Sequence, residues 1–212
     1  HPRRLQRRRR SGGLQGRERL HAVSRIRVQS KSLFGRSRQR GLLFIARRFD
    51  FDVRDGIQKG TRMPYVSHSV EETQQLARAI SERVQPGDVI LLVGDLGAGK
   101  THFTQGFAAG LGIAEVPTSP TFNLVCEYHD GRLPLYHFDL YRLEEPEELE
   151  DIDYYGITEG DGVSLVEWGD KFEEAAPDDC LVLDFKVSED GTRTIHVNAT
   201  GERARELVDG LF

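Results

Sequence analysis

The alternation of apolar and polar residues divides the chain near residue 63. Residues 1–62 keep neither a helical nor a strand period over any length. From residue 64 onward, short apolar runs alternate with amphipathic segments, a pattern typical of strands alternating with helices. The expected strands are 64–68, 88–93, 122–128, 133–139, 163–167, 180–187 and 192–198, and the expected helices are 70–85, 100–110, 146–152 and 202–210. This order predicts a three-layer α/β domain with a mixed, mainly parallel sheet and helices on both faces.

Local signals support parts of this order. Ser69 followed by Glu72 forms a capping box before the first helix. Asp130-Gly131 lies between two apolar runs, which predicts an antiparallel hairpin. The run 88–93 does not alternate, so we expect a strand that is buried on both faces.

The main chemical motif follows that buried strand. Residues 94–101 read GDLGAGKT and fit the P-loop pattern G-x-x-x-x-G-K-[ST], between a strand and a helix. Its glycines let backbone N–H groups converge on a phosphate, and the helix N-terminus adds partial positive charge. A glycine-rich turn that binds nothing would explain the glycines but not the Lys-Thr pair. The nucleotide-binding residues predicted here are Gly94, Asp95, Leu96, Gly97, Ala98, Gly99, Lys100 and Thr101.

These residues predict an ATPase of the P-loop NTPase class that uses Mg²⁺. Lys100 is expected to reach the β- and γ-phosphates, and the Thr101 hydroxyl to ligate Mg²⁺. The chain has no Asn-Lys-x-Asp segment to read guanine, which favours ATP over GTP. A second Mg²⁺ ligand should be a carboxylate at a strand end. Glu167 and Asp139 both fit, and the apolar run into Glu167 favours it; an exposed strand-end acid is the alternative for each.

Three further positions remain open on spacing alone. Ser119-Pro120-Thr121 lies where switch loops occur, although an ordinary proline turn explains it equally simply. Trp168 belongs either beside the nucleotide or in the core. His137 is either a pH-active group or an ordinary strand histidine, and the second is the default interpretation.

Charge separates the same two parts of the chain. Residues 1–62 hold 19 basic and 4 acidic side chains, whereas residues 63–212 hold 10 basic and 30 acidic ones. We therefore predict a basic, disordered leader over 1–62 and a P-loop ATPase domain over 63–212. The leader has three interpretations: a nucleic-acid arm, an organelle transit peptide, or upstream sequence translated in frame. The third is favoured because the chain starts with His1 and its only methionine is Met63.

Composition indicates the cellular compartment of the chain and the kinds of partner it can bind. Cys126 and Cys180 fall in apolar runs and are expected to be reduced core thiols, not a disulfide. The longest apolar runs, 41–46 and 89–93, are far shorter than the roughly 20 residues of a membrane span, so no membrane association is expected. The acidic domain is not expected to grip a phosphate backbone by itself. The predicted location is the cytoplasm, or an organelle if the leader is a transit peptide.

The motifs together resemble the TsaE (older name YjeE) family of bacterial ATPases over nearly all of residues 64–200. The resemblance rests on GDLGAGKT, TSPTF, YHFDLYRL, PEEL and LVEW, in this order, over residues 94–101, 118–122, 136–143, 146–149 and 165–168. It implies a switch-like loop at Ser119–Thr121, Mg²⁺ ligation by Thr101 and Glu167, and a role for Asp139 in hydrolysis. It also implies that Thr73 lies near the nucleotide. Ser119 and Trp168 complete the predicted nucleotide site.

The resemblance further implies a function in tRNA N6-threonylcarbamoyladenosine (t6A37) modification. The chain would dock on the TsaB–TsaD heterodimer and hydrolyse ATP to permit multiple turnover, while TsaD performs the transfer and tRNA is contacted only indirectly. For the hydrolysis we predict that Lys100 neutralises phosphate charge and that Asp139 or Thr121 positions water. Turnover by the chain alone should be slow because the motifs contain no obvious arginine finger. The alternatives are a P-loop small-molecule kinase and a nucleotide-gated adaptor that does not hydrolyse ATP.

Overall fold

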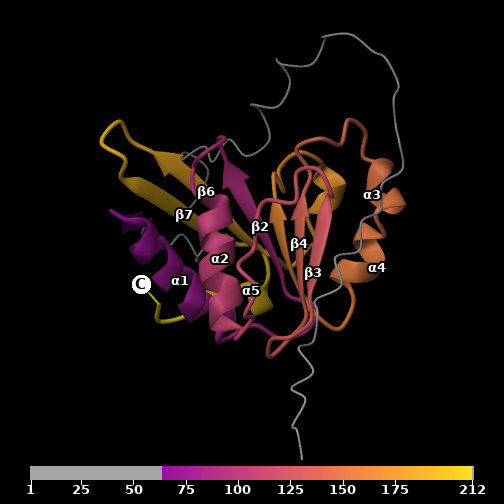
Figure 1. Ribbon diagram of the computed structural model, residues 1–212, viewed down its shortest axis with the longest axis horizontal. Helices are drawn as coiled ribbons and strands as arrows, with labels where there is room; N and C mark the ends of the chain where they lie inside the picture. The colour runs from indigo at the N-terminus through magenta and orange to yellow at the C-terminus, as the bar shows by residue number, and fades with distance from the viewer. Residues whose placement is uncertain (1–63, 212) are drawn as a thin grey trace, which may run out of the picture.

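The computed structural model describes residues 64–211, which form a seven-stranded sheet flanked by helices (Figure 1). The strand order is β1-β7-β6-β2-β5-β4-β3. The strands are β1 (Tyr65–Ser67), β2 (Val89–Gly94), β3 (Val125–Tyr128), β4 (Leu135–Asp139), β5 (Val163–Glu167), β6 (Leu181–Val187) and β7 (Arg193–Ala199). The helices are α1 (Val70–Ser81), α2 (Lys100–Gly110), α3 (Glu148–Asp151), α4 (Tyr154–Thr158) and α5 (Glu202–Val208), with a 3-10 turn at Glu173–Ala175. The basic segment 1–62 and Met63 lie outside the described residues.

The centre of the sheet is parallel and its edges are antiparallel. Strands β6, β2, β5 and β4 run parallel to one another. On one side β7 and β1 extend the sheet antiparallel, and on the other β3 pairs with β4 as the predicted hairpin. The predicted fold class, an α/β sandwich with a mixed sheet, is therefore confirmed.

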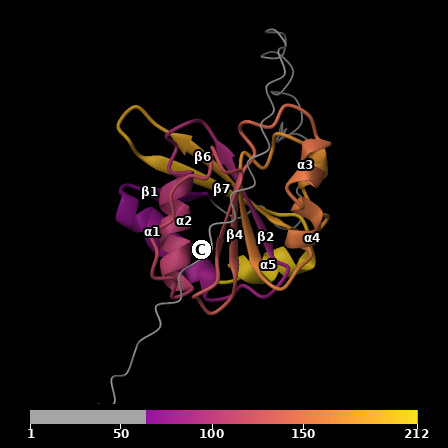
Figure 2. The same cartoon turned by 45° about the vertical axis from the view of Figure 1, so that its right-hand side comes forward.

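Apolar residues on both faces of the sheet form two core layers. Alternate residues of β2 point to opposite sides: Ile90 and Leu92 pack into the layer with α1, α2 and α5, whereas Val89 and Leu91 pack into the layer with α3 and α4. Figures 1 and 2 show α1 and α2 on one side of the sheet and α3 and α4 on the other. Burial on both faces explains why β2 reads as an unbroken apolar run.

Helices α1 and α2 cross at very close range. A Cβ atom added to Gly106 would lie 2.5 Å from the Cα of Gln74, so only glycine fits at that position without a shift. Ser69 caps α1 as predicted, because its side chain accepts a hydrogen bond from the Glu72 N–H. Among residues 64–211, no helix is both long enough and apolar enough to cross a lipid bilayer. Cys126 and Cys180 are free and buried, as expected of core thiols.

Many expected element boundaries differ from the structure by one or two residues, and a few differ by more. The first helix ends at Ser81 rather than 85, and the strand expected from 122 begins at Val125. Residues 120–124 form a turn instead, in which the N–H groups of Asn123 and Leu124 both donate to the Pro120 carbonyl. The acidic helix expected over 146–152 is shorter, and α4 follows it after Asp153, whose positive φ of 54° interrupts the helical path.

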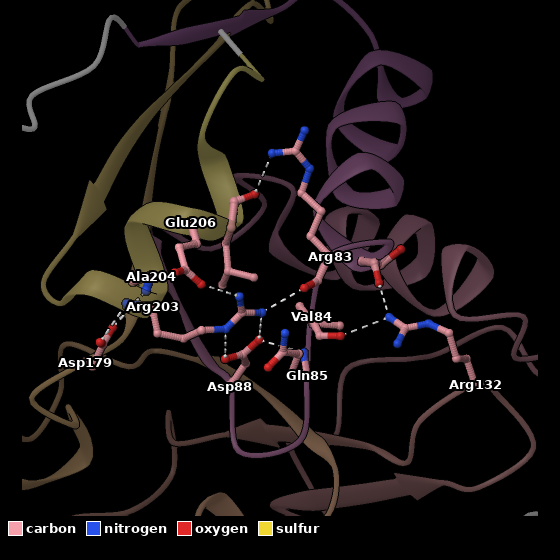
Figure 3. A network of polar contacts seen from close by, with 11 residues as sticks. Arg83, Val84, Gln85, Asp88, Arg132, Asp179, Arg203, Ala204 and Glu206 are labelled. Atoms are coloured by element: carbon pink, nitrogen blue, oxygen red, sulfur yellow. Dashed lines mark hydrogen bonds and ion pairs between the residues drawn. The ribbon is translucent and has the colours of Figure 1, made fainter.

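The end of the sheet where β2 begins is fastened to α5 by a charged network (Figure 3). Arg203 of α5 donates from Nε to Asp88 Oδ1 at 3.0 Å and from Nη2 to Asp88 Oδ2 at 2.8 Å. Its Nη2 also donates to the Arg83 carbonyl at 2.7 Å. Asp179 accepts hydrogen bonds from the backbone N–H groups of Arg203 and Ala204 in the first turn of α5. This network joins three segments of the chain: residues 83–88, Asp179 and the first turn of α5.

Candidate functional site

The predicted site residues come together at the opposite end of the parallel strands. Strand β2 ends at Gly94 and leads into the P-loop, β4 ends at Asp139, and β5 ends at Glu167. Asp139 and Glu167 are direct register partners across β4 and β5, and Glu167 is in turn the partner of Leu92 on β2. Parallel strands end on a common edge, and this edge is where α/β sheets bind ligands.

The P-loop takes a path that L side chains rarely adopt. Gly94, Gly97 and Gly99 have φ angles of 131°, 81° and 107°. At Gly94 a Cβ atom would lie 2.5 Å from the Phe185 carbonyl oxygen, so the backbone there also approaches β6 too closely for a side chain. The loop then enters α2 at Lys100, where the free N–H groups of the first helical turn begin.

Lys100 is the buried cation of the site. Its Nζ donates to the carbonyls of Gly94 and Asp95, at 2.6 and 3.0 Å, and lies 4.3 Å from the centre of the Trp168 ring. Burial lowers the pKa of the Lys100 ammonium, and the nearby carboxylates of Glu167 and Asp139 partly offset that effect. The charged form is therefore less well solvated than in water, and an anionic ligand would stabilise it.

Thr101 and Glu167 meet at the base of the loop. The Thr101 hydroxyl donates to Glu167 Oε1 at 2.9 Å, and the Nε2 atom of His137 lies 3.0 Å from the same oxygen. Glu167 is buried, and His137 is completely so. The structure therefore brings together the two predicted Mg²⁺ ligands and adds a histidine that the sequence interpretation had treated as an ordinary strand residue.

Asp139 organises the loop that contains Ser119 and Thr121. Its Oδ2 atom accepts from the Ser119 hydroxyl at 2.8 Å and from the Thr121 hydroxyl at 2.6 Å. Its Oδ1 atom accepts from the Tyr141 N–H at 3.0 Å. The two hydroxyls lie 2.8 Å apart. The loop after α2 is thus held beside the end of β4, which brings Asp139 together with two hydroxyls of the switch-like loop that the resemblance implies.

These groups line one cleft with a volume of about 380 Å³. Two lining residues, His102 and Tyr141, were not predicted from the sequence. Gly94 and Asp95 do not line the cleft and instead contact Lys100 through their carbonyls. Trp168 is partly buried and lines the cleft. Its ring centre lies 5.0 Å from that of Tyr141, with the two rings tilted by 43°, and it also packs on the core. The predicted residues in the lining are Leu96, Gly97, Ala98, Gly99, Lys100, Thr101, Ser119, Thr121, Asp139, Glu167 and Trp168.

The donor set of the cleft fits a nucleotide with Mg²⁺. The Thr101 hydroxyl and the Glu167 carboxylate are hard oxygen ligands on neighbouring elements, as Mg²⁺ prefers. Within residues 64–211 there is no group of three or more His, Cys, Asp or Glu side chains that could hold a metal ion alone. This is compatible with Mg²⁺, which usually takes one or two protein ligands and completes its shell with phosphate oxygens and water.

Arg193 and Thr73 both lie outside the lining of the cleft. Arg193, at the start of β7, donates from Nε to the Ala98 carbonyl at 3.1 Å and so fastens the P-loop to the sheet edge. The contact joins residues 95 positions apart, and no local sequence signal marks it. Thr73 was expected near the nucleotide, but it is fully buried and its hydroxyl lies 2.7 Å from the Ser67 hydroxyl.

The parallel centre of the mixed sheet, the strand–loop–helix geometry of residues 94–101 and the acidic end of β5 define the class of P-loop NTPase-like α/β proteins. The sequence model of one family, "Threonylcarbamoyl adenosine biosynthesis protein TsaE", matches residues 67–195, more than half of the chain. The chain therefore belongs to the TsaE family.

Individual relatives agree with this assignment. The chain is 47% identical to the tRNA threonylcarbamoyladenosine biosynthesis protein TsaE of Bacillus subtilis over 141 residues, which cover 66% of this chain and 88% of the relative. It is 42% identical to the protein of the same name from Treponema pallidum, over 64% of this chain and 99% of the relative. The crystal structure of Bacillus subtilis YdiB superposes with a TM-score of 0.61 at 39% identity, covering 73% of this chain and 96% of that one.

Proposed function

We propose that this chain binds ATP with Mg²⁺ in the cleft and hydrolyses ATP as a subunit of the machinery that makes N6-threonylcarbamoyladenosine at position 37 of tRNA. Family membership supports the role in this tRNA modification, because the relatives are named for it. The nucleotide chemistry rests on one observation above all: the P-loop threonine and the strand-end carboxylate are hydrogen-bonded at 2.9 Å beside a buried lysine.

We assign each side chain of the cleft a separate role in hydrolysis. Lys100 would turn from its backbone carbonyls to the phosphates, and Thr101 with Glu167 would hold Mg²⁺, which when bound neutralises developing charge. Thr121 and Asp139 would orient the attacking water, since their oxygens lie 2.6 Å apart beside the cleft. Apart from Lys100, no lysine or arginine among the described residues lines the cleft, which supports slow turnover by the chain alone.

The proposed partner is the TsaB–TsaD heterodimer. Residues 63–212 hold 30 acidic and 10 basic side chains, and such a surface repels a phosphate backbone. The link to tRNA would therefore pass through protein partners. A group supplied by such a partner would also remedy the shortage of cations in the cleft.

Reconstitution tests this function. The chain would be added with ATP and Mg²⁺ to TsaB–TsaD, TsaC and tRNA, and the modified nucleoside counted per TsaD. We expect many modifications per TsaD with the intact chain, and about one with Lys100→Ala or Thr101→Ala.

Each alternative function predicts a different outcome of this experiment. A small-molecule kinase would consume ATP only with an added acceptor and would not stimulate modification. A nucleotide-gated adaptor would support multiple turnover even when Thr101→Ala and Glu167→Ala have abolished hydrolysis. Absence of stimulation by a chain starting at Met63 would contradict the proposal.

A further inference from the structure

His137 is buried within the sheet, yet one of its ring nitrogens faces a functional carboxylate. The side chain has no exposed surface. Its register neighbours are Cys126 on β3 and Leu165 on β5, both buried and neither able to donate a strong hydrogen bond. The ring reaches from there to Glu167, where Nε2 lies 3.0 Å from Oε1. A polar ring in such surroundings requires an explanation, because burying polar groups is costly.

The hydrogen bond has a defined direction. A carboxylate accepts only, so Nε2 carries the hydrogen and His137 is the donor. The other ring nitrogen, Nδ1, has no hydrogen-bond partner in the part of the chain that the structure describes. The polarity of the ring is therefore directed at Glu167 alone. Thr101 donates to the same oxygen, so two donors from different elements fix Oε1 of this carboxylate.

We propose that His137 is a positioning residue, which holds the Glu167 carboxylate in the orientation that Mg²⁺ needs. This inference rests on the proposed function, in which Glu167 and Thr101 hold the metal. It assigns His137 no contact with nucleotide or metal. The donated hydrogen bond limits rotation of a long side chain and compensates the burial of its charge, two costs that metal binding would otherwise bear.

Measurements on other metal sites indicate how much Mg²⁺ affinity should be lost without His137. Removing a hydrogen-bond partner that orients a metal ligand typically lowers metal affinity by about 10- to 100-fold. We expect a loss in this range when His137 is replaced by leucine, which fills similar space but donates nothing. Glutamine should restore most of the affinity, because its side-chain Nε2 is separated from Cα by the same number of bonds as the histidine Nε2.

Isothermal titration calorimetry would separate the metal from the nucleotide. ADP would be titrated into the wild type, His137→Leu and His137→Gln over a series of Mg²⁺ concentrations and in EDTA. We expect the Mg²⁺ concentration for half-maximal enhancement of ADP binding to rise about 10-fold or more for the leucine variant. It should rise by less than about threefold for the glutamine variant, and ADP affinity in EDTA should be unchanged in both.

Two further variants guard against a purely structural explanation. Phe138→Leu alters the neighbouring buried residue, which faces the other core layer, and should leave Mg²⁺ dependence unchanged. His137→Asn keeps an amide that is one bond too short to reach Glu167. It should lose Mg²⁺ affinity by the amount expected for the leucine variant, and it replaces that variant as the test if His137→Leu does not fold. In a Glu167→Gln background the His137→Leu effect should shrink, because the two residues act through one contact.

The outcomes distinguish this inference from the function on which it rests. If the wild type binds ADP with no Mg²⁺ dependence, the proposed function is overturned and the inference with it. If the wild type is Mg²⁺-dependent and the leucine and asparagine variants match it, only the inference is overturned. Failure of glutamine to restore affinity, or an equal loss in Phe138→Leu, would likewise contradict the role of the donated hydrogen bond.

Discussion

Strand β2 has a buried charged group near each of its ends, Asp88 before its first residue and Lys100 after the loop that follows its last. At the first end, both oxygens of Asp88 accept hydrogen bonds from Arg203, and one of them also accepts from the Gln85 N–H. The Asp88 carboxylate therefore has hydrogen-bond donors on both oxygens. At the other end, Lys100 donates to two backbone carbonyls and faces a tryptophan ring, and within residues 64–211 no carboxylate forms an ion pair with it.

The pKa values of Arg203, the partner of Asp88, and of Lys100 shift in opposite directions. Hydrogen bonds to Asp88 raise the pKa of the Arg203 guanidinium. Burial lowers the pKa of the Lys100 ammonium, so its charge is not fully compensated by the protein. A saturated ion pair is typical of a structural contact, whereas an under-compensated cation in a cleft marks a place for an anionic ligand. The comparison therefore separates a fastening end of the sheet from a binding end.

The largest effect should follow from Glu167→Gln, which keeps the size of the side chain but removes the charge that we propose binds Mg²⁺. We expect ATP hydrolysis, measured by phosphate release, to fall by about 100- to 1,000-fold, in line with losses of electrostatic stabilisation elsewhere. The midpoint of thermal unfolding should stay the same or rise, because a buried charge kept for function is removed. A fall in that midpoint would instead place Glu167 with the fastening contacts.

The next effect concerns stability at the other end. Arg203→Ala should lower the free energy of unfolding by about 2–3 kcal/mol, because Asp88 loses its partner. This is less than for a fully buried pair, since the Arg203 side chain is 27% exposed. The measurement is urea denaturation, with the exposed Arg205→Ala on the same helix as control. ADP affinity of the folded variant should be unchanged; a parallel loss of ADP binding would show that the two ends are coupled.

The smallest effect should come from the loop held by Asp139. Thr121→Ala removes one hydrogen bond to that carboxylate and should lower ATP turnover by about tenfold, the expected cost of one hydrogen bond to a charged group. ADP affinity should stay within about twofold, whereas Thr121→Ser should restore turnover. Equal losses in the alanine and serine variants would assign the effect to the methyl group and not to the hydroxyl.

The sequence predicted those parts of the fold and site that local patterns encode. Strand β5 has the predicted bounds, Val163–Glu167, and α2 has the predicted bounds because the P-loop motif fixes its start and glycine its end. The P-loop and the two strand-end carboxylates were identified because each combines a short pattern with a chemical requirement.

The remaining features depend on contacts that no local window contains. His137 lies 30 residues from Glu167, and Arg203 lies 115 from Asp88. The start of β3 was misplaced because Leu124 takes a positive φ of 64°, which apolar character does not signal. Helix α4 was missed because it follows a left-handed Asp153 rather than a glycine or proline break. These are tertiary effects that override local preference.

Trp168 has a practical consequence for studying the chain. It is the only tryptophan in the sequence, and its backbone has a positive φ of 60°. Its indole lies 4.3 Å from the Lys100 ammonium and 5.0 Å from the Tyr141 ring, at the wall of the cleft. Tryptophan fluorescence responds to nearby charge, and all tryptophan fluorescence of this chain comes from Trp168. The chain thus contains its own optical reporter, able to follow a ligand's arrival at Lys100 in real time without any label.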